Sequence, residues 1–65
     1  MAQQTKNAIR RAFIQLLNER PLDKISIKDI AEKGAVNRDT FYYYYADIYA
    51  LVEDILQLEI QDFQS

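Results

Sequence analysis

The residues best suited to binding chemistry lie in one stretch, SIKDIAEKGAVNRDTFYYYY, which covers residues 26–45. Two short helical patterns meet there at a tight break around Gly34 and Ala35. The second pattern begins with a good helix cap, Asn37. Its next residues place polar and aromatic side chains on one side: Arg38, Asp39, Thr40, Tyr42 and Tyr43. A short helix with such a face is typical of a helix-turn-helix that enters a DNA major groove.

The opposite side of this second helix is apolar, as a helical wheel of about 100° per residue shows. With Phe41 at zero, Tyr45 lies at about 40° and Tyr44 at about 300°, whereas Tyr42 and Tyr43 lie at about 100° and 200°. We therefore expect Phe41 and Tyr45 in the core, and Tyr42 and Tyr43 facing solvent or a ligand. Tyr44 fits either surface equally well.

The first helix of the pair carries its own start signal. Ser26 is a good N-cap, and Asp29 can complete a capping box three residues later. The buried side is supplied by Ile27, Ile30 and Ala31. Lys28 points outward in the first turn, where a cation opposes the helix dipole. It is either an ordinary solvated lysine or a phosphate ligand.

The net charge of −2 hides a separation of sign along the 65 residues. Residues 1–38 hold all eight cations and four anions, which gives +4, whereas residues 39–65 hold six anions and no cation, which gives −6. Such asymmetry indicates a partner, and the basic half coincides with the helix-turn-helix pattern.

Several function classes are disfavoured by composition. The chain has no Cys and no His, which removes disulfides, thiol chemistry and the usual zinc sites. We expect no cofactor and no enzymatic activity, because there is no Gly-rich phosphate loop and no evident paired-carboxylate pocket. No apolar run approaches the ~20 residues of a membrane span, so we expect a cytoplasmic protein.

The periodicity predicts an all-α fold with helices over about 5–20, 27–33 and 38–45, and a fourth helix from residue 48. The first helix is capped by Thr5 and ended by Pro21. Its apolar residues recur at helical spacing: Ala8, Ile9, Ala12, Phe13, Leu16 and Leu17. We predict a three-helix, homeodomain-like unit over residues 1–47 and a linking helix over residues 48–65.

The fourth helix, capped by Asp47, carries two apolar stripes. The first is expected to be core and to end near Leu58; it contains Ile48, Leu51, Val52, Ile55 and Leu58. The second contains Tyr49, Leu56, Ile60 and Phe63. It is either a frayed end with a few exposed apolar residues or the seat of a missing neighbour, which would be a further domain or a second copy of the chain.

Nearly the whole chain resembles the amino-terminal DNA-binding domain of the TetR/AcrR transcriptional regulators. The resemblance rests on TKNAIRRAFIQLL, ISIKDIAEKGAVNRDTFYYYYADI and YALVEDIL. TFYYYYADIYALVEDI further resembles the dihydroxyacetone-kinase-type branch. The resemblance implies a sequence-specific, ligand-responsive repressor or activator that reads a palindromic operator as a homodimer through its third helix. It also implies a carboxy-terminal domain that binds a small-molecule inducer and supplies the dimer interface.

The resemblance also assigns roles to individual residues. Lys28 matches a position that contacts phosphate or base, and Tyr44 matches a position near the backbone. Arg38, Thr40, Tyr42 and Tyr43 match groove-facing positions. The expected DNA-binding set is Lys28, Asn37, Arg38, Asp39, Thr40, Tyr42, Tyr43 and Tyr44. The alternative function is a helical protein-interaction module that uses the acidic and apolar fourth helix.

Three positions depart from the family pattern. The turn reads Gly34-Ala35, whereas Ala-Gly is usual, so its geometry needs another explanation. Asp39 replaces a small residue or proline; its carboxylate could accept from a cytosine amine but would repel a phosphate. Ile48 stands where a phosphate-binding lysine is common, so one backbone contact is expected to be absent.

Overall fold

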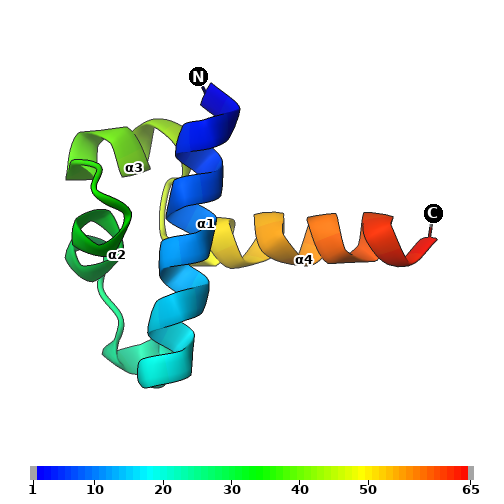
Figure 1. Ribbon diagram of the computed structural model, residues 1–65, viewed down its shortest axis with the longest axis horizontal. Coiled ribbons are helices and arrows are strands. Elements are labelled where there is room, and N and C mark those ends of the chain that lie inside the picture. The colour runs from blue at the N-terminus through cyan, green and yellow to red at the C-terminus, as the bar shows by residue number, and fades with distance from the viewer. Residues whose placement is uncertain (1, 65) are drawn as a thin grey trace.

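The computed structural model describes residues 2–64, with side chains described for residues 4–58, and its described elements are all helical. The elements are α1 (Ala2–Glu19), the 3-10 turn η1 (Leu22–Lys24), α2 (Ile27–Gly34), α3 (Arg38–Tyr44) and α4 (Ile48–Gln64). In Figure 1, α2 and α3 lie on one side of α1, while α4 crosses α1 and projects away from them. The predicted all-α class is confirmed.

Helix α1 begins earlier than the sequence pattern predicted. It starts at Ala2, so Thr5 lies inside the helix and the prediction of Thr5 as the cap is wrong. Ala and Gln have high helix propensity, which accounts for the additional turn. At the other end, the Arg20 N–H donates to the Leu16 carbonyl over 2.9 Å, and Pro21 then ends the helix as expected.

The connection between α1 and α2 contains a 3-10 turn that the sequence analysis did not predict. The Lys24 N–H donates to the Pro21 carbonyl over 2.9 Å, and the Ile25 N–H donates to the Leu22 carbonyl over 3.1 Å. The turn delivers Ile25 to the core, where its side chain is 6% exposed.

Helix α2 begins with the predicted capping box. The Asp29 N–H donates to Ser26 Oγ over 3.1 Å, and the Ser26 N–H donates to Asp29 Oδ2 over 3.0 Å. The bond from the Ser26 backbone lowers the pKa of Asp29, and the nearby Arg20 guanidinium acts in the same direction. Both orphan N–H groups are therefore satisfied locally.

The turn after α2 explains the order Gly34-Ala35. Ala35 adopts the left-handed conformation, with φ 58° and ψ 39°. The Val36 N–H donates to the Ala31 carbonyl and the Ala35 N–H to the Glu32 carbonyl, which is a Schellman ending. A Cβ on Gly34 would lie 3.3 Å from the Ala8 carbonyl oxygen of α1. Glycine is therefore used for close helix packing, and an alanine takes the left-handed position.

One hydrophobic core joins the four helices. Its buried residues are Ile9, Ala12, Phe13, Leu16, Ile25, Ile30, Phe41, Tyr45 and Leu51. Phe41 and Tyr45 are buried as predicted, at 0% and 4% exposure, and Val36 packs against the cluster from the turn. Ile48 also packs against the core, which is a structural reason for an apolar residue at that position.

Two leucines of the predicted apolar faces are exposed, and for Leu58 this contradicts the predicted core position. Leu17 is 43% exposed and Leu58 is 40% exposed. Leu17 lies at the edge of α1, where it lines an apolar hollow with Ile14, Leu22 and the α4 side chains Val52 and Leu56. Along α4, packing against the core ends at Ile55 because the helix has by then left the three-helix body.

Helix α4 starts with the predicted cap, since the Ala50 N–H donates to Asp47 Oδ1 over 2.9 Å. It runs from Ile48, the predicted start, to Gln64. In the second apolar stripe, Tyr49 is 74% and Leu56 54% exposed. Ile60 and Phe63 lie outside the residues whose side chains are described. No described helix combines the length and apolar character that crossing a membrane requires.

Candidate nucleic-acid interface

The start of α3 is fixed by its cap. Asn37 is extended, and its Oδ1 accepts from the Thr40 N–H over 3.1 Å and from the Thr40 hydroxyl over 3.4 Å. The predicted cap is confirmed. The amide oxygen of Asn37 thus already accepts two hydrogen bonds within the chain. The amide N–H groups of this side chain are the donors that it can offer to a ligand.

Two tyrosines form the aromatic part of the outer face of α3. Tyr42 is 48% exposed and Tyr43 is 81% exposed, as the wheel predicted. The Tyr42 ring meets the buried Phe41 ring edge-on with centroids 5.7 Å apart, and the Tyr43 ring meets Tyr44 edge-on at 4.9 Å. Tyr44 is half-buried against the core, which is the intermediate position that its wheel angle allowed. Packed neighbours therefore orient both exposed rings.

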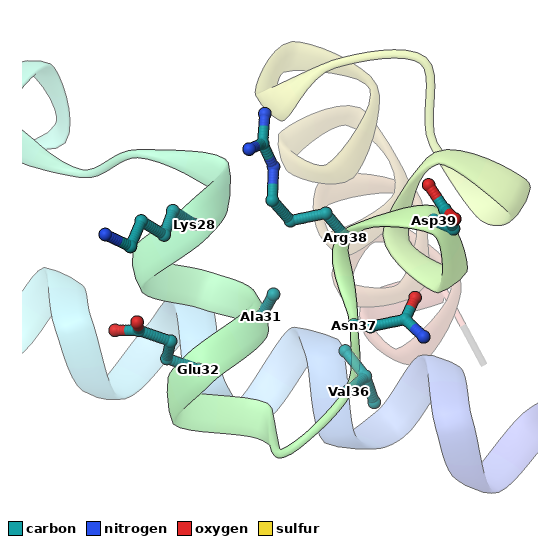
Figure 2. A pocket seen from close by; sticks show the side chains of 7 residues that line it. All are labelled: Lys28, Ala31, Glu32, Val36, Asn37, Arg38 and Asp39. Atoms are coloured by element: carbon teal, nitrogen blue, oxygen red, sulfur yellow. The ribbon is translucent and has the colours of Figure 1, made fainter.

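A hollow of about 610 Å³ separates the outer surfaces of α2 and α3. It is lined by Lys28, Ala31, Glu32, Val36, Asn37, Arg38 and Asp39. Figure 2 shows Lys28 and Glu32 projecting from α2, with Arg38 and Asp39 at the beginning of α3 and the small Ala31 between them. The turn thus brings Lys28 and three consecutive members of the predicted set, residues 37–39, around one concave surface.

The eight cations divide into two groups by what they contact. Five are committed within the chain: Lys6 and Arg10 pair with Asp54, Arg20 with Asp29, Lys33 with Glu19, and Arg11 donates to the Asn7 carbonyl. Within the described side chains, Lys24, Lys28 and Arg38 make neither an ion pair nor a side-chain hydrogen bond. Two of these three uncommitted cations line the hollow.

The same hollow contains two carboxylates, Glu32 and Asp39. Both side chains are exposed. Neither carboxylate takes part in a hydrogen bond or ion pair within the described part of the chain. The surface is therefore mixed in charge, because α2 and α3 each contribute one cation and one carboxylate to it.

A polar network connects the C-terminal end of α3 to α1 and α4. The Tyr45 hydroxyl donates to Asp54 Oδ2 over 2.5 Å, and Arg10 Nη1 donates to the same oxygen over 2.8 Å. Arg10 is itself held by Asn7, and the Lys6 ammonium lies 5.6 Å from the Tyr45 ring centroid. One carboxylate of α4 thereby joins α1 to the end of α3.

The network changes the acidity of its members. The hydrogen bond from Tyr45 lowers the pKa of Asp54, and the bond from Arg10 acts in the same direction. Burial, together with donation to the Asp54 carboxylate, raises the pKa of Tyr45 to about 12. Sequence reasoning missed this network because Arg10 lies 35 and 44 residues from its two partners, and a wheel does not show which helices meet.

Comparison with known proteins agrees with this architecture. Residues 9–55 match the model of the family described as "Bacterial regulatory proteins, tetR family". The chain is 33% identical over 57 residues to the uncharacterized HTH-type transcriptional regulator YxbF of Bacillus subtilis, a match that covers 88% of the chain and 15% of that protein. It is 39% identical over 49 residues to the uncharacterized HTH-type transcriptional regulator YvdT of the same organism, covering 75% and 25%.

The chain spans a quarter or less of the length of these two curated relatives. No solved structure matches it significantly. The family match covers α2, α3 and the turn between them together with most of α1 and the first half of α4. This chain belongs to the tetR family of bacterial regulatory proteins.

Proposed function

We propose that the chain binds double-stranded DNA sequence-specifically and regulates transcription, with α3 lying in the major groove. The observation that carries the proposal is the division of the cations. Four cations outside the α2–α3 hollow form ion pairs within the chain: Lys6, Arg10, Arg20 and Lys33. Of the three cations for which the described side chains show no such contact, Lys24 lies in η1, whereas Lys28 and Arg38 line the hollow. Neutralising phosphates supplies much of DNA affinity, so uncommitted cations mark the binding side.

The position of α4 supports the same side. Residues 39–65 carry the net charge of −6, and most of their carboxylates lie on α4. Because α4 projects away from α2 and α3 (Figure 1), the share of this charge that α4 carries lies away from the proposed DNA surface, whereas Asp39 lies at that surface. A phosphate backbone lying against α2 and α3 would therefore meet little of that repulsion.

The two cations have different roles in this proposal. Lys28 near the start of α2 holds a phosphate as a compact point charge, whereas Arg38 at the first position of α3 presents a planar fork suited to a guanine edge. Thr40, Tyr42 and Tyr43 contact the groove, Tyr44 lies near the backbone, and Asn37 contributes its amide N–H groups. These contacts would orient the domain on its site.

We also propose that residues 1–47 form the reading head and that α4 leads to a further domain. Both relatives are far longer than this chain and are named as HTH-type transcriptional regulators. In this proposal the further domain binds a small-molecule inducer and holds two copies together, so that the pair reads a palindrome. Half-sites would then lie about one DNA turn, ~34–36 Å, or a multiple of it, apart.

Salt-dependent DNA titrations of three single variants test the groove assignment. Lys28→Ala should weaken binding to all sequences similarly and reduce the salt slope by about one unit. Arg38→Ala should cost roughly 1–3 kcal/mol at its preferred base and relax the preference there. Lys33→Ala is the matched control, because it also removes one cation from α2 but one that pairs with Glu19.

The Lys33→Ala control distinguishes a phosphate contact at the position of Lys28 from a general effect of net charge. If Lys33→Ala weakens binding as much as Lys28→Ala, the loss reports net charge alone and gives no support to a phosphate contact at Lys28. Unchanged binding in both Lys28→Ala and Arg38→Ala would remove α2 and α3 from the interface. The alternative function, protein interaction through α4, would then be favoured over DNA reading by α3.

A further inference from the structure

We propose that Asp39 is a specificity-determining residue that requires a cytosine in each DNA half-site. The proposal rests on DNA binding by α3 and adds to it the identity of one base. Asp39 and Glu32 both place negative charge in a surface proposed to bind a polyanion, and Asp39 is the one that lies on α3, the helix proposed to enter the groove.

Asp39 is structurally uncommitted. Its side chain is exposed, and no side chain or backbone group of the described residues donates a hydrogen bond to it or pairs with it. The caps of α2, α3 and α4 use Ser26 with Asp29, Asn37 and Asp47 respectively. The carboxylate therefore makes no cap hydrogen bond. Its place in the first turn of α3 suits the helix dipole, an effect that any carboxylate in that turn would supply and that leaves its oxygens available to a ligand.

Asp39 lies in the middle of the exposed face of α3. Residues three and four positions apart are neighbours on a helix surface, so Asp39 adjoins both Tyr42 and Tyr43. These are the two exposed rings of α3, at 48% and 81% exposure. Asp39 also lines the hollow beside Arg38, and Figure 2 shows it at the beginning of α3. A helix that enters the groove with this face directs the carboxylate at base edges.

The major-groove edges of the four bases select among possible partners. Guanine presents only acceptors, adenine presents an acceptor beside its amine, and thymine presents an acceptor and a methyl group. Cytosine alone presents a donor, its N4 amine, with no acceptor of its own. An ionised carboxylate is an acceptor only, so cytosine is the one base that satisfies it without adding a repulsive neighbour.

The same carboxylate acts against wrong sites. A charge moved from water into the groove loses hydration, and that loss remains uncompensated unless a donor faces it. On DNA without the cytosine, Asp39 also repels the phosphates on either side of the groove. The residue therefore lowers affinity for all other sequences, which widens the ratio between the correct site and random DNA.

The test uses the full-length protein to select bound DNA from a random pool. The selected duplexes are then titrated individually. The wild type should enrich one cytosine per half-site, and replacing that C·G pair by T·A should weaken binding roughly tenfold to a hundredfold. Asp39→Asn keeps the size of the side chain but adds donors. It should lose the cytosine preference and favour adenine at the same position, since Asn pairs with adenine N6 and N7.

Glu32→Gln is the matched control. It removes one negative charge from the same hollow but leaves α3 unchanged. Both variants should bind random DNA more tightly than the wild type, and only Asp39→Asn should change the selected sequence. Circular dichroism establishes that each variant is as helical as the wild type.

Each outcome decides between the two proposals. If the wild type selects a defined site without an enriched cytosine, or if Asp39→Asn selects the same site as the wild type, the role of Asp39 is overturned while DNA reading by α3 stands. A shift produced equally by Glu32→Gln would also overturn it, because general charge would then explain the change. If the folded wild type selects no sequence, the proposed function falls together with this inference.

Discussion

Replacing Ala35 by glycine should stabilise the domain. Ala35 holds φ 58° and ψ 39° at the end of α2, and an L-residue with a Cβ in that region costs about 1–2 kcal/mol. Glycine removes that cost but loses about 0.5–1 kcal/mol more conformational entropy on folding. The balance for Ala35→Gly is a gain of about 0.5–1 kcal/mol in the free energy of unfolding. A domain of this size would then melt roughly 2–8 °C higher.

The neighbouring change should act in the opposite direction. Gly34 lies in α2 with negative φ, so alanine would gain up to about 1 kcal/mol in helix propensity. Its Cβ, however, would lie 3.3 Å from the Ala8 carbonyl oxygen and 3.4 Å from Ala12 Cβ. These atoms belong to α1 and cannot rotate away, and overpacking of this kind costs about 1–3 kcal/mol. Gly34→Ala should therefore be neutral or destabilising by up to about 2 kcal/mol.

Thermal and urea unfolding followed by circular dichroism would measure both variants and the double variant. Because the two residues adjoin, the double variant also reports whether their effects add. A stability of Ala35→Gly equal to or below that of the wild type would refute the reasoning about the left-handed turn. A stabilisation of about 1 kcal/mol by Gly34→Ala would refute the tight contact between α1 and α2.

Four further outcomes are expected. Tyr42→Phe should weaken DNA binding with little change in melting temperature, whereas Tyr45→Ala should lower stability by about 3–5 kcal/mol; the reverse pattern would invert the two faces of α3. The stabilisation from Asp54 should be complete above its ordinary pKa of 3.8 and be lost in more acidic solution, because folding lowers that pKa; acid unfolding of Asp54→Asn should lack this component. The stabilisation from Tyr45 should be present below pH 10.0 and disappear towards pH 12, because folding raises its pKa to about 12; Tyr45→Phe should abolish this alkaline loss. Amide exchange should be faster over residues 56–65 of the 65-residue chain than in a longer, dimeric protein, and a stable dimer of the short chain would contradict this.

Local signals in the sequence predicted most of the fold. The caps at Ser26, Asn37 and Asp47 were identified because the atoms that they join lie three residues apart. The wheel for α3 placed Phe41 and Tyr43 on the correct sides because a short helix with one buried face has a single consistent rotation. For the candidate site, the predicted set contains four residues of the hollow, Lys28, Asn37, Arg38 and Asp39. The structure added Ala31, Glu32 and Val36 and identified which described cations have no partner within the chain.

What the sequence did not predict depends on how helices meet. Leu17 and Leu58 fit an apolar face, but a wheel does not show where the facing helix ends. The bonds from Arg10 to Tyr45 and Asp54 depend on the crossing of α4 over α1, which no local pattern encodes. The geometry of the turn at Gly34 and Ala35 was not predicted for a similar reason. Gly34 is required by the close approach of the Ala8 carbonyl, which belongs to another helix.

The contact of Asp54 with α1 and with the end of α3 gives α4 the mechanics of a lever. Gln64 lies ten positions after Asp54, which at 1.5 Å per residue is a distance of about 15 Å along the helix. A rotation of about 10° around the Asp54 contact would displace Gln64 by about 3 Å. A movement at Gln64 would therefore reach the contact between Asp54 and Tyr45 as a much smaller displacement.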